Sequence, residues 1–194
     1  MKTQFYRRQN GFTLVELLVV ITIIAVLAGA GFAAGNAAVQ KAKKVTALAT
    51  ATAIESAINN FYTEYGAMPT TASTDETVGT NNATLIKVLL GLEGSASGAL
   101  NTRNIKFLSV KEGKAKKNGL IYNAAGTAVE GLYDPWGGWF NVTMDADYDE
   151  KLVDVKTAAG TAITLNGRRA AVWSNGADGV KGSGGAAVDD VKTW

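Results

Sequence analysis

The side chains available for chemistry are limited, because the chain contains no Cys and no His. Without thiolates or imidazoles it can build no soft-metal site, Ser–His pair or imidazole proton shuttle. The remaining ligands are carboxylate and carbonyl oxygens, which suit hard cations such as calcium. The glycine-rich segment "WSNGADGVKGSGGAAVDDVKTW" places acidic residues at Asp178, Asp189 and Asp190. The residue types favour a calcium-type loop here, the alternative being a solvated acidic tail that only Trp194 ties down.

A second acidic stretch, "DADYDEKL", alternates Asp145, Asp147 and Asp149 in the way that an EF-hand loop begins. Position 6 of such a loop is a glycine and position 12 a glutamate, whereas Glu150 and Lys156 stand there in this chain. The segment is therefore predicted to be a charged hairpin turn rather than an EF-hand.

The bulk composition argues against several function classes. Lys and Arg total 19 against 17 Asp and Glu, and a net charge of +2 with scattered basic residues favours no nucleic-acid partner. No nucleophile stands beside a base, and no P-loop or catalytic carboxylate pair stands out. With 194 residues, the chain has room for one domain and an attached segment. We therefore expect a protein that is not an enzyme.

The N-terminal segment has the order of a membrane signal. A short basic stretch with Lys2, Arg7 and Arg8 precedes a run without charge from Leu17 to Gln40. The run exceeds the roughly 20 apolar residues that a membrane span needs, and positive charge before it predicts a cytoplasmic N-terminus and an exported C-terminal part. The alternative is an ordinary signal peptide cut after Ala28-Gly29-Ala30.

Glu16 is the one carboxylate near the start of this apolar stretch. A charge in a membrane helix costs about 2.5–3.5 kcal/mol on insertion scales, so the carboxylate needs a partner. If the chain is cut between Gly11 and Phe12, the new amine at Phe12 lies four residues before Glu16, on the same helical face. We expect the amine of this chain or of a neighbour to neutralise Glu16, which would make it an assembly residue.

The run from Gly11 through Phe12-Thr13-Leu14-Val15 to Glu16-Leu17-Leu18 resembles the class III signal of type IV pilins and pseudopilins. The resemblance implies that a prepilin peptidase cuts after Gly11 and that the new terminus at Phe12 is methylated. It departs from many type IV pilins in one respect, because no Pro stands near Ala33 in the middle of the span.

Beyond the span the helical pattern continues. Apolar residues at helical spacing predict one helix from Phe12 to about Tyr65, ended by Gly66 and Pro69. Its exported half is expected to be amphipathic, and its apolar face comprises Val45, Leu48, Ile54, Ile58, Phe61, Tyr62 and Tyr65.

The rest of the chain reads as a short helix followed by strands. "ATLIKVLLGL" predicts the helix, and "GLIYN", "GWFNVTMD", "KLVDVKT" and "RRAAVWSNG" predict an antiparallel sheet of three or four strands lying on the long helix. The fold class expected is α+β and pilin-like. The expected divisions are the leader (1–11), the transmembrane helix (12–34), the amphipathic half-helix (35–66), a variable region with the short helix (67–118), and the sheet with its C-terminal calcium-type loop (119–194).

Three further stretches resemble the major pseudopilin of type II secretion systems: "FYTEYGAMPTT", "DPWGGWF" and the C-terminal "WSNGADG…DDVKTW". Gly138 and Trp139 replace the usual Asn-Pro of the second stretch. In that family the C-terminal loop wraps one calcium ion. By position, the resemblance implies side-chain ligands from Asp178, Asp189 and Asp190, with backbone oxygens from Asn175 and Val191.

Together these features lead us to expect a pseudopilin, a structural subunit of a type II secretion pseudopilus in the bacterial inner membrane, with its C-terminal domain in the periplasm. The resemblance implies that its partners are further copies of itself in a helical filament, prepilin peptidase, an inner-membrane assembly platform, minor pseudopilins, and membrane lipid before assembly. The alternatives are a type IV pilin of a surface fibre for adhesion, motility or DNA uptake and, from another class, a secreted calcium-binding module with a cleaved signal.

Overall fold

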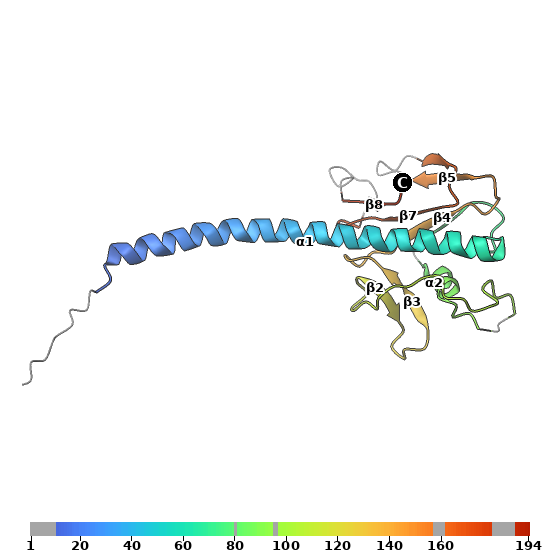
Figure 1. Cartoon of the computed structure of the whole chain (residues 1–194), viewed down its shortest axis with the longest axis horizontal. Coiled ribbons are helices and arrows are strands. Elements are labelled where there is room, and N and C mark those ends of the chain that lie inside the picture. Colours follow the sequence, from blue (N-terminus) through green and yellow to red (C-terminus); the bar gives the residue numbers. More distant parts are fainter. Residues whose placement is uncertain (1–10, 80, 95–96, 157–161, 180–188) are drawn as a thin grey trace, which may run out of the picture. The chain divides into compact units, whose positions relative to one another are not determined.

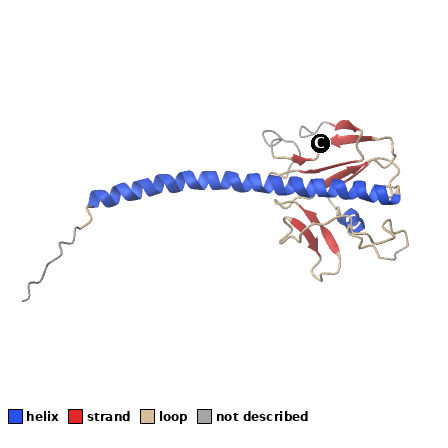
Figure 2. Cartoon of the chain, in the orientation of Figure 1, coloured by secondary structure: helices blue, strands red, loops and turns tan. Residues whose placement is uncertain are grey.

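The computed structural model describes residues 11–79, 81–94, 97–156, 162–179 and 189–194. The chain separates into two compact units, Met1–Lys41 and Ala42–Trp194, and each is described by itself. The fold is α+β, with a long helix followed by antiparallel strands, as the sequence predicts (Figures 1 and 2).

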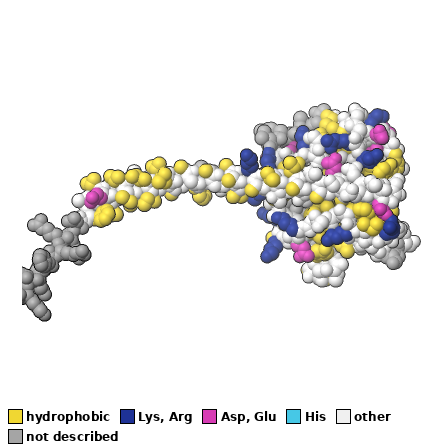
Figure 3. Space-filling view, viewed as in Figure 1, with side chains coloured by type: hydrophobic (Ala, Val, Ile, Leu, Met, Phe, Trp, Pro, Cys, Tyr) yellow, Lys and Arg dark blue, Asp and Glu magenta, His cyan; other side chains and the backbone are white. Residues whose placement is uncertain are grey.

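The long helix α1 (Leu14–Tyr65) begins in the first unit. Every described side chain from residue 11 to residue 41 is exposed, including apolar ones such as Ile21 at 56% and Phe32 at 74%. In Figure 3 apolar side chains are spread along the visible face of this helical segment, and α1 is long and apolar enough to cross a membrane. A single chain leaves this surface uncovered, and lipid or other helices are needed to remove it from water.

In the second unit α1 buries one face against the sheet. The buried positions follow the helical repeat and lie on one face: Ala47, Ala51, Ile54, Ala57, Ile58 and Phe61. The prediction was wrong for Val45 and Leu48, which are 61% and 44% exposed. The small side chains of Ala47 and Ala51 occupy the buried face, so the apolar face of the helix is not marked by its largest residues. The helix ends where Gly66 takes a φ of +68°, and its N–H bonds the Tyr62 carbonyl oxygen at 2.8 Å.

The main sheet has four antiparallel strands in the order β1-β4-β7-β8. Their bounds are β1 (Glu76–Val78), β4 (Asn141–Met144), β7 (Ala170–Ser174) and β8 (Val191–Lys192). All five residues of β7 are buried, and Ser174 pairs with Val191 of β8. The sheet therefore joins segments far apart in the sequence, and Figure 1 shows β4, β7 and β8 beside the C-terminal part of α1.

Two of the predicted strands lie outside this sheet. β2 (Gly119–Tyr122) and β3 (Val129–Tyr133) form one two-stranded sheet, and β5 (Lys151–Lys156) and β6 (Ala162–Asn166) form another, in both cases antiparallel. The prediction of one sheet made from three or four of these segments is therefore wrong, because the four-stranded sheet contains only two of them, β4 and β7. Strand segments can be found from local patterns, but which strands pair depends on contacts between distant residues.

The segment before β2 is held by two buried asparagines. It contains α2 (Ala83–Leu89), which confirms the predicted short helix. Asn82 donates to the carbonyl oxygens of Leu132 and Phe140, at 3.1 and 3.2 Å, and accepts the Leu132 N–H at 3.0 Å. Asn101, also fully buried, accepts the Tyr65 hydroxyl proton at 2.7 Å. These amides satisfy backbone groups in a region with little regular structure, which keeps it packed on the helix and sheet.

Candidate assembly and cation-binding sites

The C-terminal loop brings Asp189 to the turn that follows β7. Its Oδ2 atom accepts the backbone N–H groups of Ala177 and Asp178, at 2.7 and 3.2 Å. Gly176 takes a φ of +70°, and a Cβ atom there would lie 2.5 Å from the Asp189 carbonyl oxygen. A glycine is therefore required for the two segments to approach this closely.

Oxygen atoms suited to a hard cation are buried in this loop. Asp189 Oδ1 and Asn175 Oδ1 are both buried and have no hydrogen-bond partner among the described residues. Asp190 Oδ1 is buried as well, and Val191 begins β8 directly after it. Buried oxygens without donors are costly in a protein, and such oxygens commonly bind a water molecule or an ion. A calcium ion would satisfy Asp189 Oδ1 and Asn175 Oδ1, so these oxygens fit the predicted cofactor.

The structure does not gather the three predicted carboxylates of the loop into one acidic group. The backbone N–H of Asp178, and not its carboxylate, donates to Asp189 Oδ2. Asn175 Nδ2 donates to the Gly179 carbonyl oxygen at 3.4 Å. The predicted contribution of Asn175 was a backbone oxygen, whereas the atom buried without a donor is its side-chain oxygen. Residues 180–188 of the loop lie outside the described residues.

An acidic group is formed instead by Asp75, Asp145 and Asp147, whose carboxylate oxygens lie within 4.8 Å of one another. Asp145 is 2% exposed and accepts the N–H groups of Asp149 and Glu150, at 3.2 and 3.1 Å. Burial raises the pKa of the Asp145 carboxyl above its usual range, despite these hydrogen bonds. Sequence reasoning missed Asp75 because it is 70 residues away from Asp145 in the chain.

Asp149 does not join that group. Its carboxylate accepts the backbone N–H of Lys151 at 2.8 Å and the Lys151 ammonium at 3.2 Å, and these bonds lower its pKa. The segment is a turn, but it connects β4 to β5, which belong to different sheets. The predicted hairpin is therefore wrong, while the charged, solvent-facing character of Asp149 agrees with the prediction.

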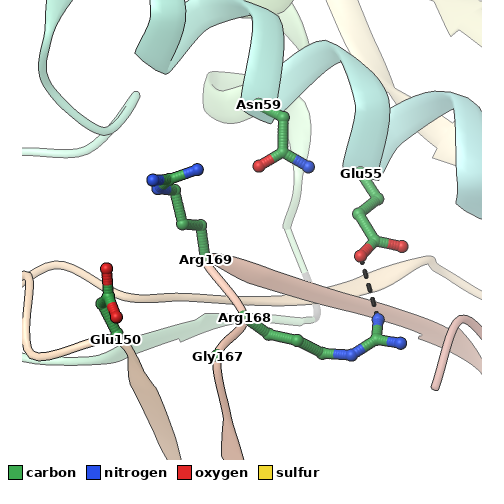
Figure 4. Close-up of a pocket in the computed structure, with 6 residues that line it drawn as sticks. All are labelled: Glu55, Asn59, Glu150, Gly167, Arg168 and Arg169. Atoms are coloured by element: carbon green, nitrogen blue, oxygen red, sulfur yellow. Dashed lines mark hydrogen bonds and ion pairs between the residues drawn. The ribbon is translucent and has the colours of Figure 1, made fainter.

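A polar hollow of about 400 Å³ lies between α1 and the β6–β7 turn (Figure 4). Its two neighbouring arginines point apart. Arg168 Nη1 bonds Glu55 Oε1 at 3.0 Å and the Thr193 carbonyl oxygen at 3.1 Å, while the Arg169 guanidinium lies 4.5 Å from the centre of the Tyr62 ring. These contacts join α1, the β6–β7 turn and the residue that follows β8, so the polar groups around the hollow have a structural role.

At the other end of the chain, Gly11 and Phe12 lie before Thr13, the last residue ahead of α1. The Phe12 side chain is 82% exposed, and an added Cβ at Gly11 would meet nothing within 4 Å. Both residues that flank the predicted cleavage point are therefore exposed within the described part of the chain. Residues 1–10 of the predicted leader lie outside the described part of the chain.

Glu16 and Thr13 form hydrogen bonds with each other at the start of α1. The Thr13 N–H and hydroxyl both donate to Glu16 Oε2, at 2.8 and 2.7 Å, and the Glu16 N–H donates to Thr13 Oγ1 at 3.2 Å. This reciprocal arrangement is a capping box, which satisfies N–H groups that a helix start leaves free. Sequence reasoning missed Thr13, although the T-x-x-E spacing at residues 13–16 is the signal for it.

The same residues lie within the part of the chain that a comparison with protein families matches. Residues 6–32 match a protein-family model described as the prokaryotic N-terminal methylation motif. The chain therefore carries a type IV pilin-like prepilin signal at these residues. The match covers the leader cleavage position, Glu16 and the first turns of α1, and not the remainder of the chain. Comparisons with curated proteins and with solved structures gave no match.

This pilin-like motif implies processing by prepilin peptidase and assembly into filaments in general. It is compatible with membrane anchoring by the exposed apolar helix. The motif is common to pilins and pseudopilins, so the choice between them must come from other parts of the chain.

Proposed function

We propose that this chain is a pseudopilin, the repeating subunit of a type II secretion pseudopilus that drives protein export. The observation that carries the proposal is the methylation motif at the start of an apolar helix whose described side chains are all exposed up to residue 41. Such a surface is stable in lipid, and in a filament it is stable against the equivalent helices of other copies. The protein is expected to have no catalytic activity of its own.

The proposed mechanism is mechanical. After cleavage, the amine of Phe12 would replace or supplement Thr13 as the partner of Glu16, and neighbouring copies would be set in register by this charge pair. Addition of subunits at the inner-membrane platform would then extend the filament through the periplasm. The "DPWGG" turn and the C-terminal loop, through their resemblance to major pseudopilins, favour secretion over a surface fibre.

One calcium ion in the C-terminal loop is part of the proposal. Asp189, Asn175 and Asp190 would supply side-chain oxygens, with further ligands expected from Asp178 and Val191. The support is the set of buried oxygens in the loop and the absence of cysteine, which leaves no disulfide to hold this segment. The ion would hold β8 and the end of the chain against β7.

A type IV pilin of a surface fibre is the second candidate. The region 67–118, which contains α2 and the buried Asn101, favours a pilin. This region adds packed structure between α1 and β2 that a minimal pseudopilin does not need.

Two measurements test the proposal. Mass spectrometry of the mature protein should find an N-methylated Phe12 at its N-terminus, and a start near Gly31 would overturn every filament role. Deleting the gene should leave folded export cargo in the periplasm. Normal secretion together with lost surface fibres would reject the pseudopilin in favour of the pilin.

A further inference from the structure

Asp134, in the "DPWGG" turn, is a buried carboxylate joined to a buried hydroxyl. Both Asp134 and Ser174 are 0% exposed, and Ser174 Oγ donates to Asp134 Oδ2 at 2.5 Å. The other carboxylate oxygen, Oδ1, accepts the N–H groups of Trp136, Gly137 and Gly138, each at 2.8 Å. The turn therefore fixes the position of the carboxylate, and the carboxylate fixes that of the hydroxyl.

Ser174 passes this orientation to the C-terminal loop. A hydroxyl has one proton to donate, and in Ser174 that proton is used by Asp134. Its oxygen is left as an acceptor, and it receives the Gly176 N–H at 3.2 Å. The end of β7 is thereby linked to the first residue of the loop that takes a left-handed conformation, since Gly176 has a φ of +70°.

The next residues of the same turn hold Asp189. The N–H groups of Ala177 and Asp178 both donate to Asp189 Oδ2, which leaves Oδ1 as the buried oxygen without a partner among the described residues. A rotation of the turn at Gly176 would move both donors, and the free oxygen would move with them. The chain of contacts thus runs from Asp134 through Ser174 and Gly176 to Asp189.

We infer that Asp134 and Ser174 are positioning residues for a cation held by Asp189 Oδ1 and Asn175 Oδ1. This inference rests on the calcium site of the proposed function and adds the residues that preorganise it. Neither residue is assigned as a ligand. Both carboxylate oxygens of Asp134 accept hydrogen bonds, from the turn and from Ser174, and the Ser174 oxygen accepts the Gly176 N–H. Mutation of a residue that orients metal ligands commonly lowers the metal affinity by about 10–100-fold.

The test uses the full chain in detergent micelles. Calorimetry measures its calcium affinity in a titration, and the melting temperature is measured with and without the ion. Ser174→Ala should weaken calcium binding by about 10–100-fold. Thr143→Val is the matched control, because Thr143 is also buried and its hydroxyl bonds only Thr77 Oγ1 among the described residues, at 2.8 Å. The control should bind calcium with the affinity of the unaltered chain.

Asp134→Asn provides a second variant. It keeps an oxygen for the three turn N–H groups but presents an amide donor to Ser174 in place of an acceptor, so it should also weaken calcium binding. Equal calcium affinity in the unaltered chain and in a folded Ser174→Ala or Asp134→Asn variant would overturn the inference. An unaltered chain that binds no calcium would instead remove the proposed site itself, together with any residues that position it.

Discussion

Thr13 and Glu16 exchange hydrogen bonds at the first turn of α1, so the carboxylate within the apolar segment already has partners in an isolated chain. Before processing, these bonds lower the cost of placing Glu16 near lipid. Cleavage after Gly11 would add a positive amine one residue before Thr13. The capping box would then hold the carboxylate next to the site where the new charge appears.

The two roles of Glu16 can be separated by mutation. Glu16→Ala should leave membrane insertion intact, because it removes a charge, but it should block filament assembly. Thr13→Ala should cost about 1 kcal/mol of helix-cap stability while keeping the carboxylate, so some assembly should remain. Assembly can be followed by sedimentation and by electron microscopy of the filaments. Normal filaments from Glu16→Ala would refute the proposed role.

Removal of calcium is expected to destabilise the unit Ala42–Trp194. Chelation should lower the melting temperature of the full chain in detergent, because an ion that binds only the folded state stabilises it by mass action. Asp189→Asn should melt at the same temperature with and without chelator. A melting temperature that chelation leaves unchanged in the unaltered protein would contradict the calcium site.

Asp145 should titrate at a higher pH than an ordinary aspartate. Burial raises its pKa, and the hydrogen bond with Asp147 raises it further. A raised carboxyl pKa favours the protonated form in the folded state. Its contribution to stability is therefore complete below the unfolded pKa of about 3.9 and is lost as pH rises through the folded value.

This titration can be followed through the carboxyl carbon shift of Asp145 in NMR spectra of the full chain. Asp147→Asn should lower the midpoint, whereas Asp178→Asn, outside the acidic group, should leave it unchanged. A midpoint for Asp145 at or below that of exposed Asp149 would contradict the prediction, because hydrogen bonds from Lys151 lower the pKa of Asp149.

Any side chain at position 131 should destabilise the folded protein. A Cβ there would lie 2.1 Å from Trp139 Cζ3, and the residue has a φ of +157°. Gly131→Ala should lower the free energy of unfolding by about 1–3 kcal/mol, the usual cost of overpacking. Denaturation of the single variants and of Gly131→Ala combined with Trp139→Ala should show coupling between the two sites. Strictly additive effects would place the cost in the backbone rather than in the contact with the indole ring.

The elements that could be read from the sequence are those set by neighbours in the chain. The uncharged run, the residues of the methylation motif and the helical spacing beyond Lys41 predicted α1, because helical hydrogen bonds and side-chain faces repeat within four residues. The "DPWGG" turn was predictable for the same reason, since Asp134 bonds N–H groups two to four residues ahead. Even so, the pattern misplaced Val45 and Leu48, because the larger apolar residue is not always the buried one.

Only the tertiary structure decided which distant groups meet. It divided the predicted strands between one sheet and two hairpins, placed Asp75 beside Asp145, and joined Asp134 to Ser174 across 40 residues of sequence. These contacts depend on how the helix, the sheet and the loops bury their apolar faces together. No local pattern encodes them, because their energy arises only when segments remote in the chain exclude water from the same place.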